Sequence, residues 1–201
     1  MERAGRHRAL AVRYLALGDS YTIGTGASDD AHAWPSIIAG RLGAELTNPA
    51  VNGYTTEDLI RDELPLFRTL QPDLVTVLIG VNDLVQGRTP DAYHTSLRRI
   101  YDELKDARVV AVSIPTWSYV PAAADFGGAR HVDGLTGIFN AVAREEAETR
   151  GVAWVDIGPA STSRIGSRGW IASDQLHPGD TQYAAWAEVI WPVVERVAAR
   201  R

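Results

Sequence analysis

The chain has 201 residues, a formal net charge of −5 at pH 7 and no cysteine. This composition excludes disulfides, thiolate metal sites and cysteine nucleophiles, and it offers no basic surface for a nucleic-acid partner. The longest apolar run, residues 74–81, is too short for a transmembrane segment, so we expect one globular domain over residues 1–201 with frayed ends at about 1–10 and 199–201.

The first ten residues carry several basic side chains. No apolar stretch of the kind that forms the centre of a signal peptide follows them, which argues against a secretory signal. We therefore expect a cytoplasmic location for the chain as given.

Five short apolar runs are predicted to be strands. The clearest is residues 73–79, which contains Leu-Val-Thr-Val-Leu-Ile. The other four runs are residues 12–17, 44–47, 108–114 and 152–157. The third and fourth runs are apolar on both faces, as is typical of strands in a parallel sheet that helices cover on both sides.

Longer amphipathic segments alternate with these runs and are predicted to be helices. They are residues 34–42, 56–70, 90–106, 132–150 and 181–200. Thr89 before Pro90 is a plausible helix start, whereas Pro65 and Pro192 are candidates for kinks. Alternation of this kind predicts right-handed crossovers and a three-layer α/β/α domain.

Ser20 follows the first predicted strand, directly after Gly18 and Asp19. Glycine permits a tight turn, and a serine that opens the next helix would present its hydroxyl at the carboxyl edge of the sheet, where open α/β proteins bind ligands. The backbone N–H groups of a helix start are unpaired and can stabilise an oxyanion. The alternative is that Asp19 or Ser20 simply caps the helix.

His177 lies three residues after Asp174 and directly before Pro178 and Gly179. A serine hydroxyl is a poor nucleophile until a neutral imidazole takes its proton. A carboxylate on the other ring nitrogen fixes the imidazole tautomer and stabilises the imidazolium, and Asp174 has the spacing to do this. The alternative is an aspartate that caps the last helix beside a surface histidine.

Asn82 and Gly53 are candidate donors to an oxyanion. Asn82 follows the strongest predicted strand, and its amide can donate a hydrogen bond, which an ionised Asp83 cannot. Gly53 follows the second predicted strand and could present its backbone N–H without obstruction. The alternatives are an ordinary turn at Asn82 and a glycine required for positive φ at position 53.

Together these segments make the chain closely similar to the SGNH-hydrolase, or GDSL esterase/lipase, family over nearly its whole length. Four segments resemble the family's sequence blocks: Gly18-Asp19-Ser20, Asn48 with Gly53, Gly80-Val81-Asn82-Asp83, and Asp174 to Pro178. The similarity is closest to bacterial single-domain esterases related to lysophospholipases, on Trp34-Pro35 and on Tyr183 with Trp186.

This resemblance implies a flavodoxin-like three-layer sandwich around a five-stranded parallel sheet with strand order 2-1-3-4-5. It implies that Ser20 is the nucleophile, that His177 is the base and acid, and that Asp174 is the partner of the histidine. The Ser20 N–H, the Gly53 N–H and the Asn82 side chain would form the oxyanion hole. The implied reaction needs no metal and no organic cofactor.

Trp117 and Tyr119 follow the fourth predicted strand, where the rim of such a site would lie. They could line an acyl or alcohol pocket, or they could pack a long loop onto the domain. Alanines at 122–124 and glycines at 127 and 128 indicate a mobile segment, a candidate lid.

We therefore expect an enzyme that hydrolyses small-molecule carboxylic esters with small to medium acyl chains through an acyl-serine intermediate. The alternatives are a carbohydrate O-deacetylase, an acyl thioesterase, and a catalytically idle binding domain with the same fold. A nucleotide-binding protein is disfavoured because the turn after the first strand has neither a Walker A loop nor a dinucleotide fingerprint.

Overall fold

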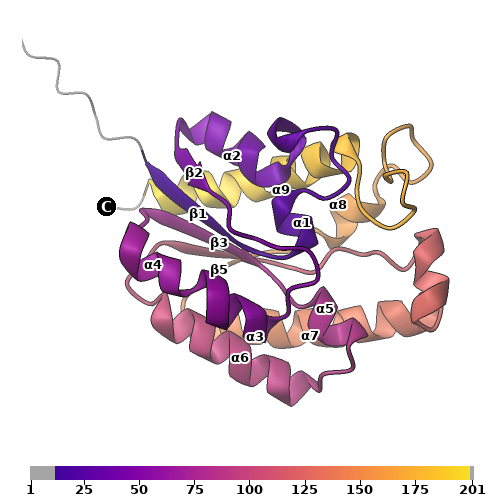
Figure 1. Cartoon of the computed structure of the whole chain (residues 1–201), viewed down its shortest axis with the longest axis horizontal. Helices are drawn as coiled ribbons and strands as arrows, with labels where there is room; N and C mark the ends of the chain where they lie inside the picture. Colours follow the sequence, from indigo (N-terminus) through magenta and orange to yellow (C-terminus); the bar gives the residue numbers. More distant parts are fainter. Residues whose placement is uncertain (1–11, 200–201) are drawn as a thin grey trace, which may run out of the picture.

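A computed structural model describes residues 12–199 and contains a five-stranded parallel sheet (Figure 1). The strand order is β2-β1-β3-β4-β5. The strands are β1 (Arg13–Gly18), β2 (Glu45–Thr47), β3 (Leu74–Leu78), β4 (Val109–Val112) and β5 (Ala153–Val155). Each strand lies within the predicted run or one residue from it, and the flavodoxin-like strand order is confirmed.

The central strands β1 and β3 carry the segments that matter most for function. All five residues of β3 are buried, because helices cover both faces of the sheet. β1 pairs with β3 in a register that ends with Gly18 opposite Leu78. The segment that follows Gly18 and the segment that follows Leu78 therefore leave the sheet side by side.

The helices form two layers around the sheet, as Figure 1 shows. On one face, α2 (Trp34–Leu42) packs against α9 (Asp180–Ala198). On the other face, α6 (Pro90–Glu103) packs against α7 (Ala129–Thr149). The predicted three-layer α/β/α architecture is confirmed, with the apolar core on both sides of β1 and β3.

The single helix predicted over residues 56–70 is instead three consecutive pieces. They are α3 (Thr56–Asp58), a π-helical turn η2 (Leu59–Glu63) and α4 (Pro65–Leu70). Proline cannot donate a backbone hydrogen bond, so Pro65 opens a new helix rather than continuing the old one. The wide turn before it directs Glu63 inward, where only 1% of its surface is exposed.

Short helices follow the carboxyl ends of the strands and were not predicted as separate elements. They are α1 (Ser20–Ile23), η1 (Asp30–His32), α5 (Val81–Val85), η3 (Pro121–Phe126) and α8 (Gly158–Thr162). All of them lie between the end of a strand and the next long helix. They therefore build the sheet edge at which the sequence places the site.

The ends of three long helices differ from the predictions by a few residues. α6 ends at Glu103, α7 begins at Ala129, and α9 runs from Asp180 through Pro192 to Ala198. The predicted frayed residues 1–10, together with Arg200 and Arg201, lie outside the described residues. Within residues 12–199, none of the helices has both the length and the apolar character needed to cross a membrane.

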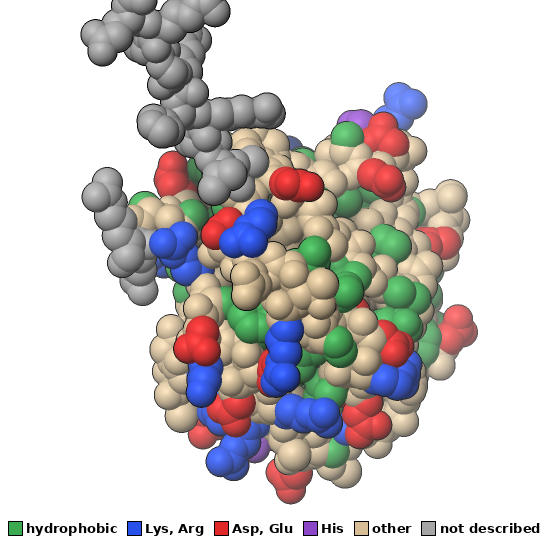
Figure 2. All heavy atoms as spheres, turned by 60° about the vertical axis from the view of Figure 1, so that its left-hand side comes forward, with side chains coloured by type: hydrophobic (Ala, Val, Ile, Leu, Met, Phe, Trp, Pro, Cys, Tyr) green, Lys and Arg blue, Asp and Glu red, His purple; other side chains and the backbone are tan. Residues whose placement is uncertain are grey.

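Acidic and basic side chains are interspersed on the face drawn in Figure 2, rather than collected in patches of one sign. Several of the charged side chains of the described residues form ion pairs, among them Arg13 with Asp73 and Arg41 with Glu188. Exposed pairs of this kind contribute little to stability, so they do not position the site.

Candidate active site

Ser20 is the first residue of α1, immediately after β1. A Cβ at Gly18 would lie 2.3 Å from the carbonyl oxygen of Leu78, so only glycine lets the end of β1 lie this close to β3. Asp19 caps α1, and its Oδ1 accepts a hydrogen bond from the N–H of Tyr21 at 3.0 Å. The capping interpretation therefore applies to Asp19, and it leaves the Ser20 hydroxyl free for another role.

His177 and Asp174 form a hydrogen-bonded pair within one turn. His177 Nδ1 lies 2.6 Å from Asp174 Oδ2, and Asp174 Oδ1 accepts the backbone N–H groups of Leu176 and His177. Partial burial raises the pKa of Asp174, but the hydrogen bonds from His177 and the two N–H groups outweigh it and lower the pKa below its ordinary value. The carboxylate is thus ionised and fixed where it can orient the ring.

Backbone pairing holds this histidine segment in place. The N–H of Ala172 donates to the carbonyl of His177 at 2.8 Å, and Ile171 pairs with Pro178 in an isolated antiparallel bridge. Gly26 packs against the same segment, since a Cβ at Gly26 would lie 2.5 Å from the carbonyl oxygen of Pro178. The position of the imidazole is therefore set by backbone contacts as well as by Asp174.

Ser20 and His177 line the same small pocket, although they are far apart in sequence. Its volume is about 60 Å³, and its lining residues are Ser20, Tyr21, Val81, Asn82, Val85, Trp117, Phe126, Leu176 and His177. The rings of Tyr21 and His177 meet edge to face, with centroids 6.0 Å apart. The hydrogen bonds of the described residues do not include one between Ser20 and His177, and such contacts often form only when substrate binds.

Asn82 lies in the first turn of α5 rather than in an open turn, and it lines this pocket. Its Nδ2 donates to the carbonyl of Tyr54 at 2.9 Å. An amide nitrogen carries two hydrogens, so one N–H is held by Tyr54 while the other can serve a ligand. This contact fixes the orientation of the amide.

Gly53 has a φ of +83° and is not among the residues that line the pocket. Gly53 therefore has the positive φ that the alternative interpretation of this glycine expected. Gly53 directly precedes Tyr54, whose carbonyl binds the Asn82 amide, so the turn that contains it lies beside the pocket.

The two aromatic candidates have different positions. Trp117 is buried, lines the pocket, and donates from its Nε1 to Thr136 Oγ1 at 3.2 Å. Tyr119 is not among the lining residues, and its hydroxyl accepts hydrogen bonds from Trp170 and Gln182. The expectation that Tyr119 lines the pocket is therefore corrected, because these bonds direct its hydroxyl to α9 and to the loop before it.

Three buried carboxyl groups lie behind the nucleophile turn: Glu63 was missed at the level of sequence, and the burial of Asp19 and Asp83 was not predicted. Burial raises the pKa of Asp19 to about 7 and the pKa of Glu63 to about 8, and it also raises the pKa of Asp83. Glu63 Oε2 accepts the Gly18 N–H at 2.9 Å. An acidic residue among the apolar positions of residues 59–64 was the signal that could have identified Glu63.

Asp83 connects two segments that border the pocket. It accepts hydrogen bonds from the Thr56 N–H at 2.8 Å and from the Thr56 hydroxyl at 2.6 Å, and it lies 3.4 Å from Arg88. Its carboxylate thereby ties the start of α3 to α5. Asp83 supports the position of Asn82 without reaching the pocket itself.

Within residues 12–199, no cluster of His, Asp and Glu side chains is arranged to hold a metal ion. The titratable pair at the pocket is His177 with Asp174. The chemistry that this arrangement permits is proton transfer at a serine hydroxyl beside an amide donor.

Comparison with known proteins finds a matching family and similar proteins. The sequence model of the GDSL-like Lipase/Acylhydrolase family matches residues 16–185. The chain is 27% identical over 139 residues to Thioesterase 1/protease 1/lysophospholipase L1 of Escherichia coli strain K12, and the match covers 68% of this chain and 64% of that protein. The match thus spans less than two thirds of the relative's length.

Solved structures share the fold at lower sequence identity. The crystal structure of TesA matches with a TM-score of 0.73 and 21% identity, covering 92% of this chain and 99% of TesA. An acetylxylan esterase from Geobacillus stearothermophilus matches with a TM-score of 0.72 and 18% identity, covering 91% of this chain and 94% of that one. At these identities the two likenesses establish the architecture alone.

Proposed function

Because the chain belongs to the GDSL-like lipase/acylhydrolase family of SGNH hydrolases, we propose that it cleaves carboxylic esters through an acyl-serine intermediate. Family membership makes it a hydrolase of small-molecule esters. The observation that carries the finer proposal is that Ser20 and His177 line one pocket, with Asp174 bonded to the far ring nitrogen of the histidine.

In the proposed reaction, His177 takes the Ser20 proton while the serine oxygen attacks the ester carbonyl carbon. Asp174 holds the Nδ1 proton, which leaves the other ring nitrogen as the base and stabilises the imidazolium. Protonated His177 then gives its proton to the departing alcohol oxygen. A water molecule attacks the acyl-serine by the same proton path and releases the carboxylic acid.

In the tetrahedral intermediate, the former carbonyl oxygen carries a negative charge. Hydrogen-bond donors that are in position before the reaction stabilise this charge. We assign this role to the backbone N–H of Ser20, the second N–H of the Asn82 amide and the N–H of Gly53. Support is strongest for Asn82, because its contact with Tyr54 presets the amide. Gly53 belongs to the neighbouring turn and lies outside the pocket lining.

The pocket supports small to medium acyl groups. Its volume of about 60 Å³ is small, and five of its lining residues are apolar: Val81, Val85, Trp117, Phe126 and Leu176. An apolar wall stabilises a bound acyl chain by removing its surface from water, at about 25 cal/mol per Å². A longer chain would have to extend out of the pocket.

The proposal is tested by replacing the nucleophile and following the acyl-enzyme. Ser20→Ala should lose turnover of p-nitrophenyl acetate by up to about 10⁶-fold, as in other serine hydrolases. It should also lose labelling by a fluorophosphonate, which marks the activated serine. Ser173→Ala is a matched control, because Ser173 is exposed on the histidine segment and lies outside the pocket lining. Unchanged turnover or labelling in Ser20→Ala would refute the proposal.

An acyl thioesterase is the second candidate, because the Escherichia coli relative is named a thioesterase as well as a lysophospholipase. The same serine, histidine and amide groups would act on an acyl thioester. Comparing kcat/KM for p-nitrophenyl esters, acyl thioesters and lysophospholipids separates the two candidates. A catalytically idle domain would turn over none of them and would not be labelled by the fluorophosphonate.

A further inference from the structure

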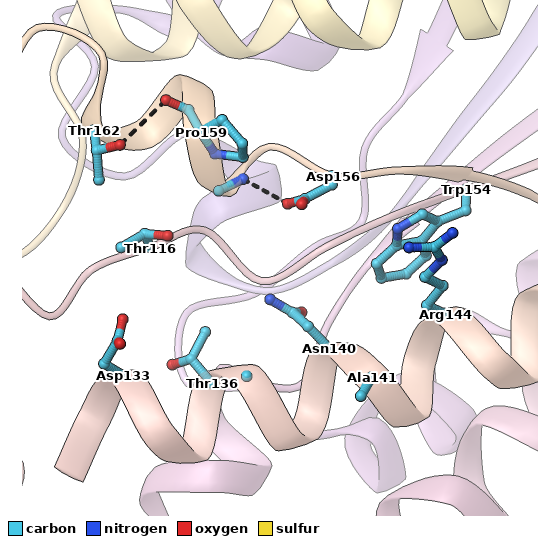
Figure 3. A pocket seen from close by; sticks show the side chains of 12 residues that line it. Thr116, Asp133, Thr136, Asn140, Ala141, Arg144, Trp154, Asp156, Pro159 and Thr162 are labelled. Carbon is cyan, nitrogen blue, oxygen red and sulfur yellow. Dashed lines mark hydrogen bonds between the residues drawn. The ribbon is translucent and has the colours of Figure 1, made fainter. Parts of the chain in front are cut away.

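The segment between β4 and α7 borders both the proposed catalytic pocket and a larger open groove. Its residue Thr116 lines this groove, of about 650 Å³, together with Thr136 of α7 and Thr162 of α8 (Figure 3). An open groove supplies no packing atoms on that side of the segment, so directional contacts fix its position. The first of these is the bond from Trp117 Nε1 to Thr136 Oγ1 at 3.2 Å, and the second lies at Tyr119.

The hydroxyl of Tyr119 is the centre of a set of hydrogen bonds that we call the hydroxyl cluster. It accepts the Nε1 hydrogen of Trp170 at 3.1 Å and an Nε2 hydrogen of Gln182 at 2.5 Å. Both donors belong to buried side chains, and both also reach the carbonyl oxygen of Ser161, at 3.1 and 3.3 Å respectively. The hydroxyl therefore joins its own segment to α9, which carries Gln182, and to the segment that begins at Trp170.

The segment that begins at Trp170 is one arm of a short antiparallel pair, and the other arm carries His177. The carbonyl of Trp170 accepts the Gly179 N–H at 3.0 Å, and the Ala172 N–H donates to the carbonyl of His177 at 2.8 Å. A two-stranded pair is marginally stable by itself, so its position depends on the contacts that hold its first arm. The indole N–H of Trp170 supplies such a hold through its bond to the Tyr119 hydroxyl.

The turn between the two arms contains a backbone conformation that needs support. Gln175 has a φ of +61°, in the left-handed region that is costly for a residue other than glycine. Such conformations persist where surrounding contacts over-determine them. Asp174 Oδ1 accepts two N–H groups of the turn, whereas the bond from the Ala122 N–H to the Gln175 carbonyl is long, at 3.4 Å. The turn therefore depends more on the shorter bonds of the hydroxyl cluster.

We propose that Tyr119 is a positioning residue for His177. Gln182 of α9 fixes the hydroxyl, the hydroxyl fixes the arm at Trp170, and the backbone pairing of that arm sets the position of the imidazole relative to Ser20. Tyr119 does not line the pocket, so it acts through the histidine segment and not on the substrate. This inference rests on the proposed function, because it assigns a role in proton transfer from Ser20 to His177.

Tyr119→Phe tests the proposal, because it removes the hydroxyl and keeps the ring. Both buried donors retain the Ser161 carbonyl as an acceptor, so the variant is expected to fold. We expect kcat for p-nitrophenyl acetate to fall by about tenfold, since a small displacement of a catalytic group is costly. KM should change by less than about twofold, because Trp117 in the pocket wall is held separately by Thr136.

Tyr14→Phe is the matched control, because it also removes a buried tyrosine hydroxyl. The Tyr14 hydroxyl lies 2.9 Å from Thr76 Oγ1, and Tyr14 stands at the start of β1, whereas Ser20 follows its end. Its kcat should stay within about twofold of the wild type, and thermal unfolding of both variants measures their stability. Equal losses of kcat in the two variants would overturn the proposal, because a general loss of stability would then explain both.

Amide hydrogen exchange follows the histidine segment without any catalysis. Exchange at Ala172 and Gly179, whose N–H groups form the backbone pairing, should accelerate by about tenfold in Tyr119→Phe relative to Tyr14→Phe, after normalisation to the amides of β3. Unchanged exchange would overturn the proposal. If Ser20→Ala kept its turnover, the proposed function would fail, whereas exchange would still report whether the hydroxyl holds the segment.

Gln182→Met tests whether the hydroxyl is the common link. Alone it should lower kcat by about threefold or more, because Tyr119 loses its bond to α9. Combined with Tyr119→Phe, it should lower kcat by no more than about twofold beyond Tyr119→Phe alone, since both changes break the same connection. An unchanged kcat in Gln182→Met, or a combined loss equal to the product of the two single losses, would overturn the assignment to the hydroxyl.

Discussion

Glu63 Oε2 accepts the backbone N–H of Gly18 at 2.9 Å, so a buried carboxyl group holds the chain two residues before the proposed nucleophile. The other oxygen, Oε1, has no hydrogen-bond partner among the described residues. Burial, with smaller contributions from the carboxyl groups of Asp19 and Asp62, raises the pKa of Glu63 to about 8 against the opposing effect of the Gly18 N–H. The protonated form of Glu63 is therefore favoured in the folded protein.

The raised pKa of Glu63 predicts that stability falls with pH. Between its ordinary pKa of 4.5 and about 8, the folded protein holds a proton on Glu63 that the unfolded chain has released, so the free energy of unfolding decreases as pH rises through this range. In Glu63→Gln, the decrease in the free energy of unfolding between pH 5 and pH 9 should be smaller than in the wild type by about 1–3 kcal/mol. Urea unfolding at several pH values measures this. Glu145→Gln is the exposed control, and equal pH slopes for wild type and Glu63→Gln would contradict the prediction.

The pairing of Asp174 with His177 predicts a loss of activity without a loss of fold. Asp174→Asn keeps the size of the side chain but can present an N–H to Nδ1, which favours the wrong imidazole tautomer. We expect kcat for p-nitrophenyl acetate to fall by about 10²- to 10⁴-fold. Nitrogen NMR of His177 should report the tautomer change, and Asp106→Asn in an exposed turn is the control. Unchanged kcat would remove Asp174 from the mechanism.

Replacement of Gly26 is a second change that should displace His177. Alanine at position 26 would bring its Cβ to 2.5 Å from the Pro178 carbonyl oxygen and 3.0 Å from His177 Cβ, so the histidine segment must shift. We expect kcat to fall by about tenfold or more, since misplacement by 1 Å is costly. Gly87→Ala is the control that separates the steric clash from backbone strain. Gly87 also has positive φ, but its Cβ would meet nothing within 4 Å. Similar kinetics in the two variants would show that strain alone is responsible.

Removal of the Asn82 amide should slow the chemical step. Asn82→Ala removes both the contact with Tyr54 and the proposed donor to the oxyanion, so kcat should fall by about 10²- to 10³-fold with a smaller change in KM. Gln86→Ala in the cap of α5 is the control, because this side chain is exposed. A change confined to KM would mean that Asn82 binds substrate without stabilising the transition state.

The sheet could be predicted from the sequence because each strand is a short apolar run between polar or glycine-rich segments. The register of β1 and β3 could not be predicted in this way, because both faces of these strands are buried and a shift by one residue would exchange two buried faces. Apart from the helix start expected at Ser20, the short helices α1, α5 and α8 could not be predicted, because they have too few residues to show a period. The π-helical turn η2 was missed for a related reason: one extra residue per turn leaves the apolar pattern of residues 56–70 nearly unchanged.

The polar residues of the site were easier to place than their neighbours. Ser20, Asn82 and His177 each follow or precede a strongly patterned element, so the topology alone brings them to one edge of the sheet. Tyr119 was misplaced because two aromatic residues of one loop, Trp117 and Tyr119, can point in different directions although only Ser118 separates them. Glu63 was missed because its burial depends on the local winding of η2, which the sequence pattern does not encode.

Phe126 lines the pocket, and its removal gives a prediction about acyl-chain length. It lies at the end of η3, its ring meets Trp117 edge to face with centroids 5.5 Å apart, and it is 37% exposed. Removing the ring in Phe126→Ala widens a pocket of only about 60 Å³, so longer acyl chains should fit better.

We expect the ratio of kcat/KM for p-nitrophenyl hexanoate to that for the acetate to rise by about five- to tenfold in Phe126→Ala, because one or two of the four added methylenes can then be buried at about 0.8 kcal/mol each. Ile138→Ala is the matched control, because Ile138 is an exposed apolar side chain on α7 that does not line the pocket. The ratio should stay near the wild-type value in this control. A fall in the Phe126→Ala ratio would mean that the ring binds the chain rather than limiting its length, and an unchanged ratio would place the acyl group elsewhere.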